Sequence, residues 1–133
     1  MKMPKHYLKY FLVFTIVAVF YTIARADIFD DLALAIKGGN SREIANYFNS
    51  SIELTTPSSE GFYSKSQAEI ILKKFFENYP CNSFNIAHRG SSSAGSKYAI
   101  GNYNSNGNSF RVYIYMKDNG GKSILHELKF EKD

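Results

Sequence analysis

The last third of the chain alternates apolar and polar residues, and this alternation constrains the fold more than any other feature. Three alternating stretches cover residues 97–103, 109–117 and 122–131, with Asn106-Gly107 in the first gap and Gly120-Gly121 in the second. Asn-Gly and Gly-Gly pairs supply the positive backbone φ angles that tight hairpin turns need. The region therefore predicts three antiparallel strands joined by two hairpins.

The middle strand of the three has two chemically different faces. One parity carries Phe110, Val112, Ile114 and Met116, and the other carries Arg111, Tyr113, Tyr115 and Lys117. A period of two is typical of a sheet that buries one side and leaves the other in contact with solvent. We therefore expect the phenylalanine and aliphatic positions to face the interior.

The first 26 residues have the three parts of a secretory signal peptide. Three lysines lie within the first nine residues, residues 10–24 are apolar or weakly polar, and Ala24-Arg25-Ala26 places small residues before a cut at Asp27. The apolar run is shorter than the ~20 residues that cross a bilayer comfortably, which favours cleavage over an uncleaved membrane anchor. We expect export to the periplasm or the extracellular space, with only transient membrane contact.

Residues 27–133 are long enough for a single domain. The whole chain is 44% hydrophobic, which is enough for a core, and its net charge of +4 arises in the leader. Four of the 16 basic residues precede Asp27, which leaves 12 against 12 acidic residues in the domain. This balance argues against a nucleic-acid partner, which would require a basic patch. The single cysteine, Cys81, excludes an intrachain disulfide.

Three helices are expected before the long strands. Apolar residues recur at helical spacing over residues 27–36, and Gly38-Gly39 ends that helix. Asn40 followed by Glu43 has the spacing of a capping box and begins a second short helix. A third helix runs from the capping residue Ser64 to about Tyr79, before Pro80.

Shorter strands are expected at residues 52–56, 62–63 and 84–89, with a Gly/Ser-rich loop at residues 90–96. Helices that precede a largely antiparallel sheet indicate an α+β domain, with the helices packed on one face of the sheet.

These patterns resemble the nuclear transport factor 2-like superfamily, which has a cone-shaped α+β fold. The resemblance covers essentially all of residues 27–132 and is carried by Ile44 to Phe48, Ile52-Glu53-Leu54, Gly61 to Ala68 and Leu72 to Phe76. The chain is more closely similar to a family of small exported bacterial domains without an assigned function, through Gly90-Ser91-Ser92, Tyr98 to Gly101 and Phe110 to Tyr113. The resemblance implies three N-terminal helices on a curved, mostly antiparallel sheet, with a pocket between them.

Strand parity suggests which residues would line that pocket. The expected lining is Tyr98, Asn102, Phe75, Phe110, Ile114 and Leu128, together with the two histidines His88 and His126. Two inward histidines could polarise a carbonyl or shuttle a proton, as in a lyase or isomerase. The alternative, which we favour, is that these histidines are satisfied by hydrogen bonds and take no part in chemistry.

The opposite face of the sheet is expected to carry Tyr103, Arg111, Tyr113, Tyr115 and Leu125. Tyrosine and arginine are enriched where proteins meet, so this face is a candidate interface for a homodimer. The resemblance adds that such sheets often pack against each other through their outer faces. The alternative is that the tyrosines brace a half-exposed sheet through cross-strand pairs.

No cofactor or metal is expected from the sequence. One of the three histidines, His6, lies in the leader, and no paired spacing of metal ligands is present. Cys81 lacks the surroundings of a catalytic thiol. The first hypothesis is therefore an exported, non-catalytic domain that binds a small molecule or an exported protein and forms a dimer. The second is a cavity enzyme that uses His126 with His88 or Tyr98.

Overall fold

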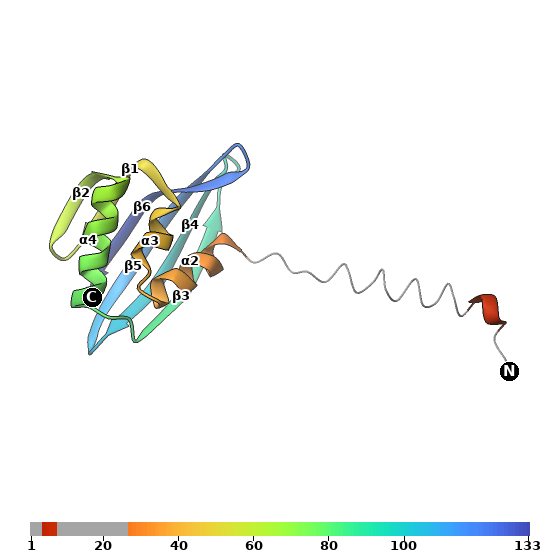
Figure 1. Ribbon diagram of the computed structural model, residues 1–133, viewed down its shortest axis with the longest axis horizontal. Helices are drawn as coiled ribbons and strands as arrows, with labels where there is room; N and C mark the ends of the chain where they lie inside the picture. The colour runs from red at the N-terminus through yellow and green to blue at the C-terminus, as the bar shows by residue number, and fades with distance from the viewer. Residues whose placement is uncertain (1–3, 8–26) are drawn as a thin grey trace.

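The structure is a computed structural model that describes residues 4–7 and 27–133 (Figure 1). Apart from residues 4–7, the predicted signal peptide lies outside the described residues. Within the described ranges, no helix is both long enough and apolar enough to cross a bilayer.

Three helices occupy the first half of the domain, as predicted: α2 (Ile28–Lys37), α3 (Ser41–Ala45) and α4 (Lys65–Asn78). The Asp27 carboxylate caps α2 by accepting a hydrogen bond from the Phe29 backbone N–H (3.3 Å). At α4, Ser64 and Gln67 form a reciprocal capping box, in which each side chain accepts the other's backbone N–H. These caps satisfy donors at the first turns that the helices cannot satisfy themselves.

The sheet has six strands: β1 (Phe48–Thr56), β2 (Ser59–Ser64), β3 (Ser83–Ser91), β4 (Ser96–Ser105), β5 (Asn108–Asn119) and β6 (Lys122–Lys132). Their order across the sheet is β2-β1-β6-β5-β4-β3. The β1–β6 pair is parallel, and the other neighbours are antiparallel. The predicted α+β class is confirmed, and the strands are longer than their sequence signals suggested.

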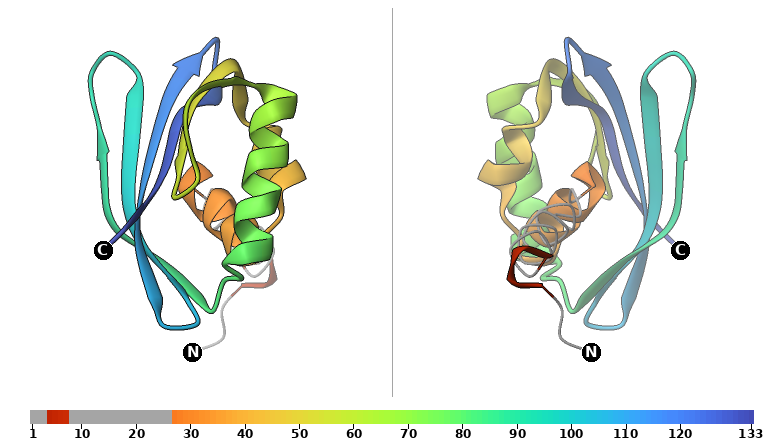
Figure 2. Two further views of the ribbon diagram at one scale, coloured as in Figure 1. Left: turned by 90° about the vertical axis from the view of Figure 1, so that its left-hand side faces the viewer. Right: turned by 90° about the vertical axis from the view of Figure 1, so that its right-hand side faces the viewer.

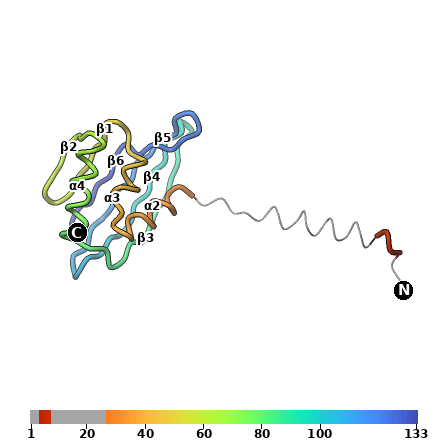
Figure 3. Tube along the Cα trace, in the orientation of Figure 1, coloured from red at the N-terminus to blue at the C-terminus, as the bar shows by residue number. Residues whose placement is uncertain are grey.

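Both predicted hairpin turns are present. Asn106 and Gly107 have φ angles of 46° and 84°, and Gly120 and Gly121 have φ angles of 59° and 82°. The β3–β4 loop lies beside the β5–β6 turn (Figure 3), where the Asp118 backbone N–H donates to the Gly95 carbonyl (2.9 Å). This contact ties the two long hairpins together at one end of the sheet.

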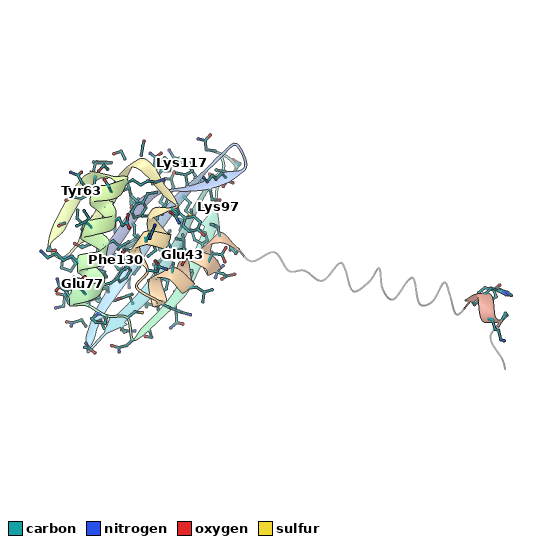
Figure 4. All side chains as sticks on the ribbon, in the orientation of Figure 1. Glu43, Tyr63, Glu77, Lys97, Lys117 and Phe130 are labelled. Atoms are coloured by element: carbon teal, nitrogen blue, oxygen red, sulfur yellow. The ribbon has the colours of Figure 1, made fainter. Side chains whose placement is uncertain are left out.

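The helices cover one face of the sheet and leave the other bare (Figure 2). Between helices and sheet lies a cluster of aromatic rings, in which the Phe75 and Phe130 centroids are 4.3 Å apart and the Phe75 and Phe110 centroids are 5.4 Å apart. Figure 4 labels Phe130 within this layer. The buried members are Phe75, Phe76, Phe84, Tyr103, Phe110 and Phe130. The space in which a pocket was expected is therefore filled by side chains.

The predicted parity of β4 is wrong. Ala99, Gly101 and Tyr103 face the helices, so Tyr98 is 48% exposed on the other face, where Asn102 is exposed as well. The reason is steric, since a Cβ on Gly101 would lie 2.6 Å from the Phe84 ring. The inner side of β4 therefore needs small residues at this point. Because Ala99 and Gly101 are small, the alternation of large apolar residues did not mark them as facing inward.

A bulge in β3 reverses the predicted orientation of His88. Ile86 pairs with Gly101, but His88 pairs with Ile100, which leaves Ala87 as an extra residue. One inserted residue moves every later side chain to the opposite face. His88 is therefore exposed on the uncovered face, and Arg89 turns toward α2 instead.

A second bulge, in β6, changes the positions of Leu125 and His126. Tyr115 pairs with Glu127, whereas Met116 pairs with Leu125, so His126 is the extra residue. Leu125 consequently lies in the core with 0% exposure and does not belong to the outer face. His126 does not enter the interior, and the prediction of two inward histidines is wrong.

Candidate functional site

The uncovered face of the sheet carries a groove of about 330 Å³ over β4, β5 and β6. Its side chains come from alternate positions of the strands and are Tyr98, Ile100, Tyr113, Tyr115 and Glu127. Three tyrosine rings and an isoleucine make the walls and floor largely apolar, and the carboxylate lies on the β6 side. We call this site the tyrosine groove.

Strand register brings the rings together. Tyr98 pairs with Tyr115, and Ile100 pairs with Tyr113, across the β4–β5 ladder. Directly opposed side chains on one face of an antiparallel pair lie about 5 Å apart at Cβ, so each pair is in contact range. The Tyr98 ring also lies directly over Gly90 of β3, as shown by the 2.3 Å that would separate it from a Cβ at that position. Glycine at position 90 thus leaves room for the Tyr98 ring at the edge of the groove.

A second hollow of about 360 Å³ adjoins the tyrosine groove and shares Tyr115 and Glu127 with it. Its other lining residues are Asn49, Ser51, Glu53, Phe62 and His126. Phe62 is 74% exposed, which is unusual for so large an apolar side chain. The two hollows together make a surface that runs across the uncovered face from β4 to β2.

The charge within this surface is concentrated in one cluster. Lys129 Nζ lies 3.5 Å from Glu53 Oε1 and 3.7 Å from Glu127 Oε1. Partial burial, followed by a hydrogen bond with Glu53, raises the pKa of the Glu127 carboxyl above its usual value. Burial works to lower the pKa of Lys129, but the two carboxylates outweigh it and the pKa is raised. Lys129 is therefore cationic and forms ion pairs with both Glu53 and Glu127.

Two further cations flank the tyrosine groove. Lys117 Nζ lies 5.8 Å from the centroid of the Tyr115 ring, a cation–π contact within the chain. Arg111 Nε lies 4.0 Å from Asp133 Oδ1, and the Arg111 side chain is about half exposed. The arginine thus has one long ion pair, and about half of its side chain stays in contact with solvent.

The side chains of His88 and His126 lie too far apart to contact one substrate atom together. His88 lies on β3 and His126 on β6, with β4 and β5 between them. At the usual strand spacing this separates them by at least about 14 Å. Burial, and then the charge of Lys117, lowers the pKa of His126. This geometry does not support the predicted pairing of the two histidines on one substrate.

Cys81 lies in a separate hollow of about 410 Å³ near the end of α4, beside Lys37 and Lys73. Burial raises the pKa of its thiol, which keeps the thiol protonated and a poor nucleophile. Within the described part of the chain, no group of three or more His, Cys, Asp or Glu side chains is placed to hold a metal ion.

The start of the domain is held by an ion pair that the sequence did not reveal. Arg89 donates to Asp27 Oδ2 (2.7 Å) and to Asp30 Oδ1 (2.6 Å). The hydrogen bond from Arg89 is the main cause that lowers the pKa of Asp30. The β3 bulge turns Arg89 toward α2, so the ion pairs of Arg89 with Asp27 and Asp30 depend on the bulge.

The predicted site residues therefore divide differently from expectation. Phe75, Phe110, Ile114 and Leu128 face inward as predicted, but as packed core. Arg111, Tyr113 and Tyr115 lie on the uncovered face as predicted, and Tyr98 joins them there. Tyr103, predicted on that face, is 0% exposed, and its hydroxyl donates to the Tyr79 carbonyl (2.5 Å). Ile100, Phe62, Glu53 and Glu127 were not identified as site residues from sequence.

A family model described as "Domain of unknown function (DUF4783)" matches residues 29–131. The chain belongs to this DUF4783 family. The match covers the whole folded domain, so the predicted resemblance to a family without an assigned function is confirmed. No curated protein matches the chain.

Solved structures support the same assignment. A DUF4783 protein from Bacteroides uniformis is 26% identical, with a TM-score of 0.74, and the match covers 80% of this chain and 98% of that chain. One from Bacteroides ovatus is 24% identical with a TM-score of 0.71, and the match covers 77% and 92%. An NTF-2 like protein of unknown function from Silicibacter pomeroyi is 8% identical with a TM-score of 0.57, over 78% and 88% of the chains. The nuclear transport factor 2-like fold is thus shown.

Proposed function

We propose that this DUF4783 domain is an exported, non-catalytic interaction module that associates with itself through the uncovered face of its sheet. The observation that carries the proposal is the contrast between a filled interior and a tyrosine groove of about 330 Å³ on a face that none of the helices in residues 27–133 covers. A cavity enzyme needs open space beneath the helices, and aromatic rings occupy that space.

The chemistry of the uncovered face fits association. Tyrosine and arginine are enriched in interfaces because they bury much surface at a small cost in conformational entropy. Here three tyrosines are joined by the exposed Phe62 and by Arg111. The face also mixes both signs of charge, with Arg111, Lys117 and Lys129 against Glu53, Glu127 and Glu131. A surface with both signs can be complementary to a second copy of itself.

The competing explanation is that the tyrosines only brace the sheet. Bracing and association predict different consequences when the rings are removed. If Tyr113 and Tyr115 serve the fold, their loss lowers the free energy of unfolding and leaves the oligomeric state unchanged. If they serve an interface, their loss changes the oligomeric state and costs little stability.

Sedimentation equilibrium of residues 27–133 separates the two explanations. We expect the wild type to be dimeric at micromolar concentrations and the double variant Tyr113→Ser, Tyr115→Ser to be monomeric. Ile70→Ser is the matched control, because Ile70 is 67% exposed on α4, away from the uncovered face. A wild type that stays monomeric at about 1 mM, or a double variant that associates as the control does, would refute the proposal.

Export is supported by the leader and by the position at which the fold begins. Asp27, the first residue after the predicted cut, is the N-cap of α2 and is held by Arg89. Cleavage there would leave the whole domain intact. Expression of the full chain in a Gram-negative host, with N-terminal sequencing of the periplasmic fraction, should yield a protein that starts at Asp27. Recovery in the membrane fraction with the leader retained would favour the anchored alternative.

A further inference from the structure

The cations on the uncovered face differ in how well they are paired. In the described part of the chain, Lys129 lies between two carboxylates, and Lys117 lies over the Tyr115 ring. Arg111 has one long contact, 4.0 Å from Nε to Asp133, and 52% of its side chain is exposed. The terminal nitrogens of Arg111 therefore remain open to another partner.

The tyrosine groove has the composition that suits a planar cation. Its walls are the rings of Tyr98, Tyr113 and Tyr115, and its β6 side carries the Glu127 carboxylate. A guanidinium stacks on aromatic rings and pairs with carboxylates more effectively than an ammonium, because it is planar and weakly hydrated. The intrachain contact of Lys117 already shows that the Tyr115 ring accepts a cation at its face.

We propose that, in the dimer, Arg111 of each subunit inserts into the tyrosine groove of the other, against the Tyr115 ring and toward Glu127. This inference rests on the proposed function, because it names the contact by which the two copies recognise each other. The occupant of the groove is thus a second copy of this chain, and the chemistry that it presents is a guanidinium.

Strand geometry allows both contacts to form at once. Arg111 and Tyr115 lie on the same face of β5, four residues apart, which is about 13 Å along the strand. A twofold axis that lies between the two sheets and crosses β5 at Tyr113 would bring Arg111 opposite Tyr115 of the partner subunit. The same axis would bring Asn102 opposite Tyr98 of the partner subunit, because Asn102 pairs with Arg111 and Tyr98 pairs with Tyr115.

The charges near such an axis are compatible with close approach. Lys129 pairs with Tyr113 across the β5–β6 ladder, so the two copies of Lys129 would come near each other. Each is already held by Glu53 and Glu127 of its own chain, and the pair of acids more than balances its charge. The same axis would bring Glu131 of the partner subunit near Glu127, because Glu131 pairs with Arg111 and Glu127 pairs with Tyr115, so the partner's Arg111 would lie between these two carboxylates.

Coupling between Arg111 and Glu127 is diagnostic of a contact between subunits. Within one chain, Arg111 pairs with Glu131, and Glu127 lies four residues before Glu131 on β6. The intrachain separation is again about 13 Å, and substitutions that far apart normally have additive effects. A non-additive effect on association must therefore arise across the interface.

The test is a double-mutant cycle on the dimer dissociation constant of residues 27–133, measured by sedimentation equilibrium at pH 8, a pH chosen well above the ordinary carboxyl range because the pKa of Glu127 is raised. Arg111→Gln should raise Kd about 30-fold, since two cation–π contacts are lost in each dimer. Arg111→Lys should raise Kd less. In the double variant with Glu127→Gln, the effect should be clearly smaller than the product of the two single effects. Arg42→Gln, an exposed arginine on α3, is the matched control and should leave Kd unchanged.

The outcomes distinguish this inference from the proposed function. If the wild type dimerises but Arg111→Gln behaves like Arg42→Gln, the inference is wrong and the proposed function stands. Additive effects of the substitutions at Arg111 and Glu127 would likewise overturn the assignment of the groove. If the wild type does not dimerise at all, the proposed function fails, and the contact fails with it.

Discussion

The two faces of one sheet place the same residue types in different surroundings. On the helix-covered face, Tyr103 is 0% exposed, packs 5.6 Å from Phe75 between ring centroids, and donates its hydroxyl to a backbone carbonyl. On the opposite face, which the helices of residues 27–133 leave uncovered (Figure 2), Tyr113 and Tyr115 are half-buried. Aromatic content alone therefore does not identify the core of this domain. Whether an aromatic side chain belongs to the core depends on whether another element covers its ring.

The largest difference between the faces should appear when a ring is deleted. Phe130→Ala on the inner face should cost about 3–5 kcal/mol of unfolding free energy, because it leaves a cavity among packed aromatic rings. Tyr113→Ala on the outer face should cost less than about 1 kcal/mol in the monomer. Urea unfolding of both variants below the dimer dissociation constant measures this. Equal costs would mean that the outer ring is part of the core.

Two glycines, one against each face of the sheet, test the difference between the faces without the loss of any ring. Gly101→Ala places a Cβ 2.6 Å from the buried Phe84 ring and 2.9 Å from the Asn85 carbonyl, so it should destabilise by about 1–3 kcal/mol. Gly90→Ala meets the Tyr98 ring, which is 48% exposed and can turn away. We expect Gly90→Ala to cost less stability but to weaken dimerisation. Thermal unfolding and sedimentation of the two variants check both effects, and a reversed order of stability would contradict this view.

A smaller effect is expected from single hydroxyl groups. Tyr103→Phe removes the donor to the buried Tyr79 carbonyl and should cost about 1 kcal/mol. Tyr113→Phe is the matched substitution on the uncovered face and should be nearly neutral, since Tyr113 is only half-buried there. Chemical denaturation of the two variants side by side is the measurement. A neutral Tyr103→Phe would show that the Tyr79 carbonyl finds another donor.

The smallest effect concerns the pH dependence of stability. The folded-state pKa of Glu127 is raised, so its ionisation disfavours the folded state. Protonated Glu127 contributes its full stabilisation of the fold at pH values below the pKa of this carboxyl in the unfolded chain. That contribution is lost as the pH rises through the pKa of the carboxyl in the folded domain. Glu127→Gln should therefore gain stability relative to wild type as pH rises above 4.5, and the difference should become constant once the folded-state carboxyl is fully ionised. A difference that shrinks as pH rises would contradict the stated direction.

Much of the fold follows from short-range sequence signals. The caps at Asn40 and Ser64 and the Asn106-Gly107 and Gly120-Gly121 turns are local, so their chemistry is visible in neighbouring residues. The alternation of β5 is also regular, and its two faces are assigned correctly, with Val112 buried and Arg111 exposed.

The candidate site was predicted less well, because it depends on two bulges and on one crowded glycine. The bulges at Ala87 and His126 reverse parity, and a rule with a strict period of two cannot represent them. One signal was available in β6, where Leu125 and Leu128 are three residues apart and both are buried. Nothing local marks Gly101 as inward, since its need for space comes from Phe84 on the neighbouring strand.

The central claim is that the uncovered face binds a second copy of the chain while the covered face holds the fold. The most direct test is to record the tyrosine ring resonances of residues 27–133 by NMR over a hundredfold dilution. We predict concentration-dependent shifts for Tyr98, Tyr113 and Tyr115, and constant shifts for the buried Tyr103. Resonances that do not change with concentration, or changes confined to residues of the helices, would contradict the claim.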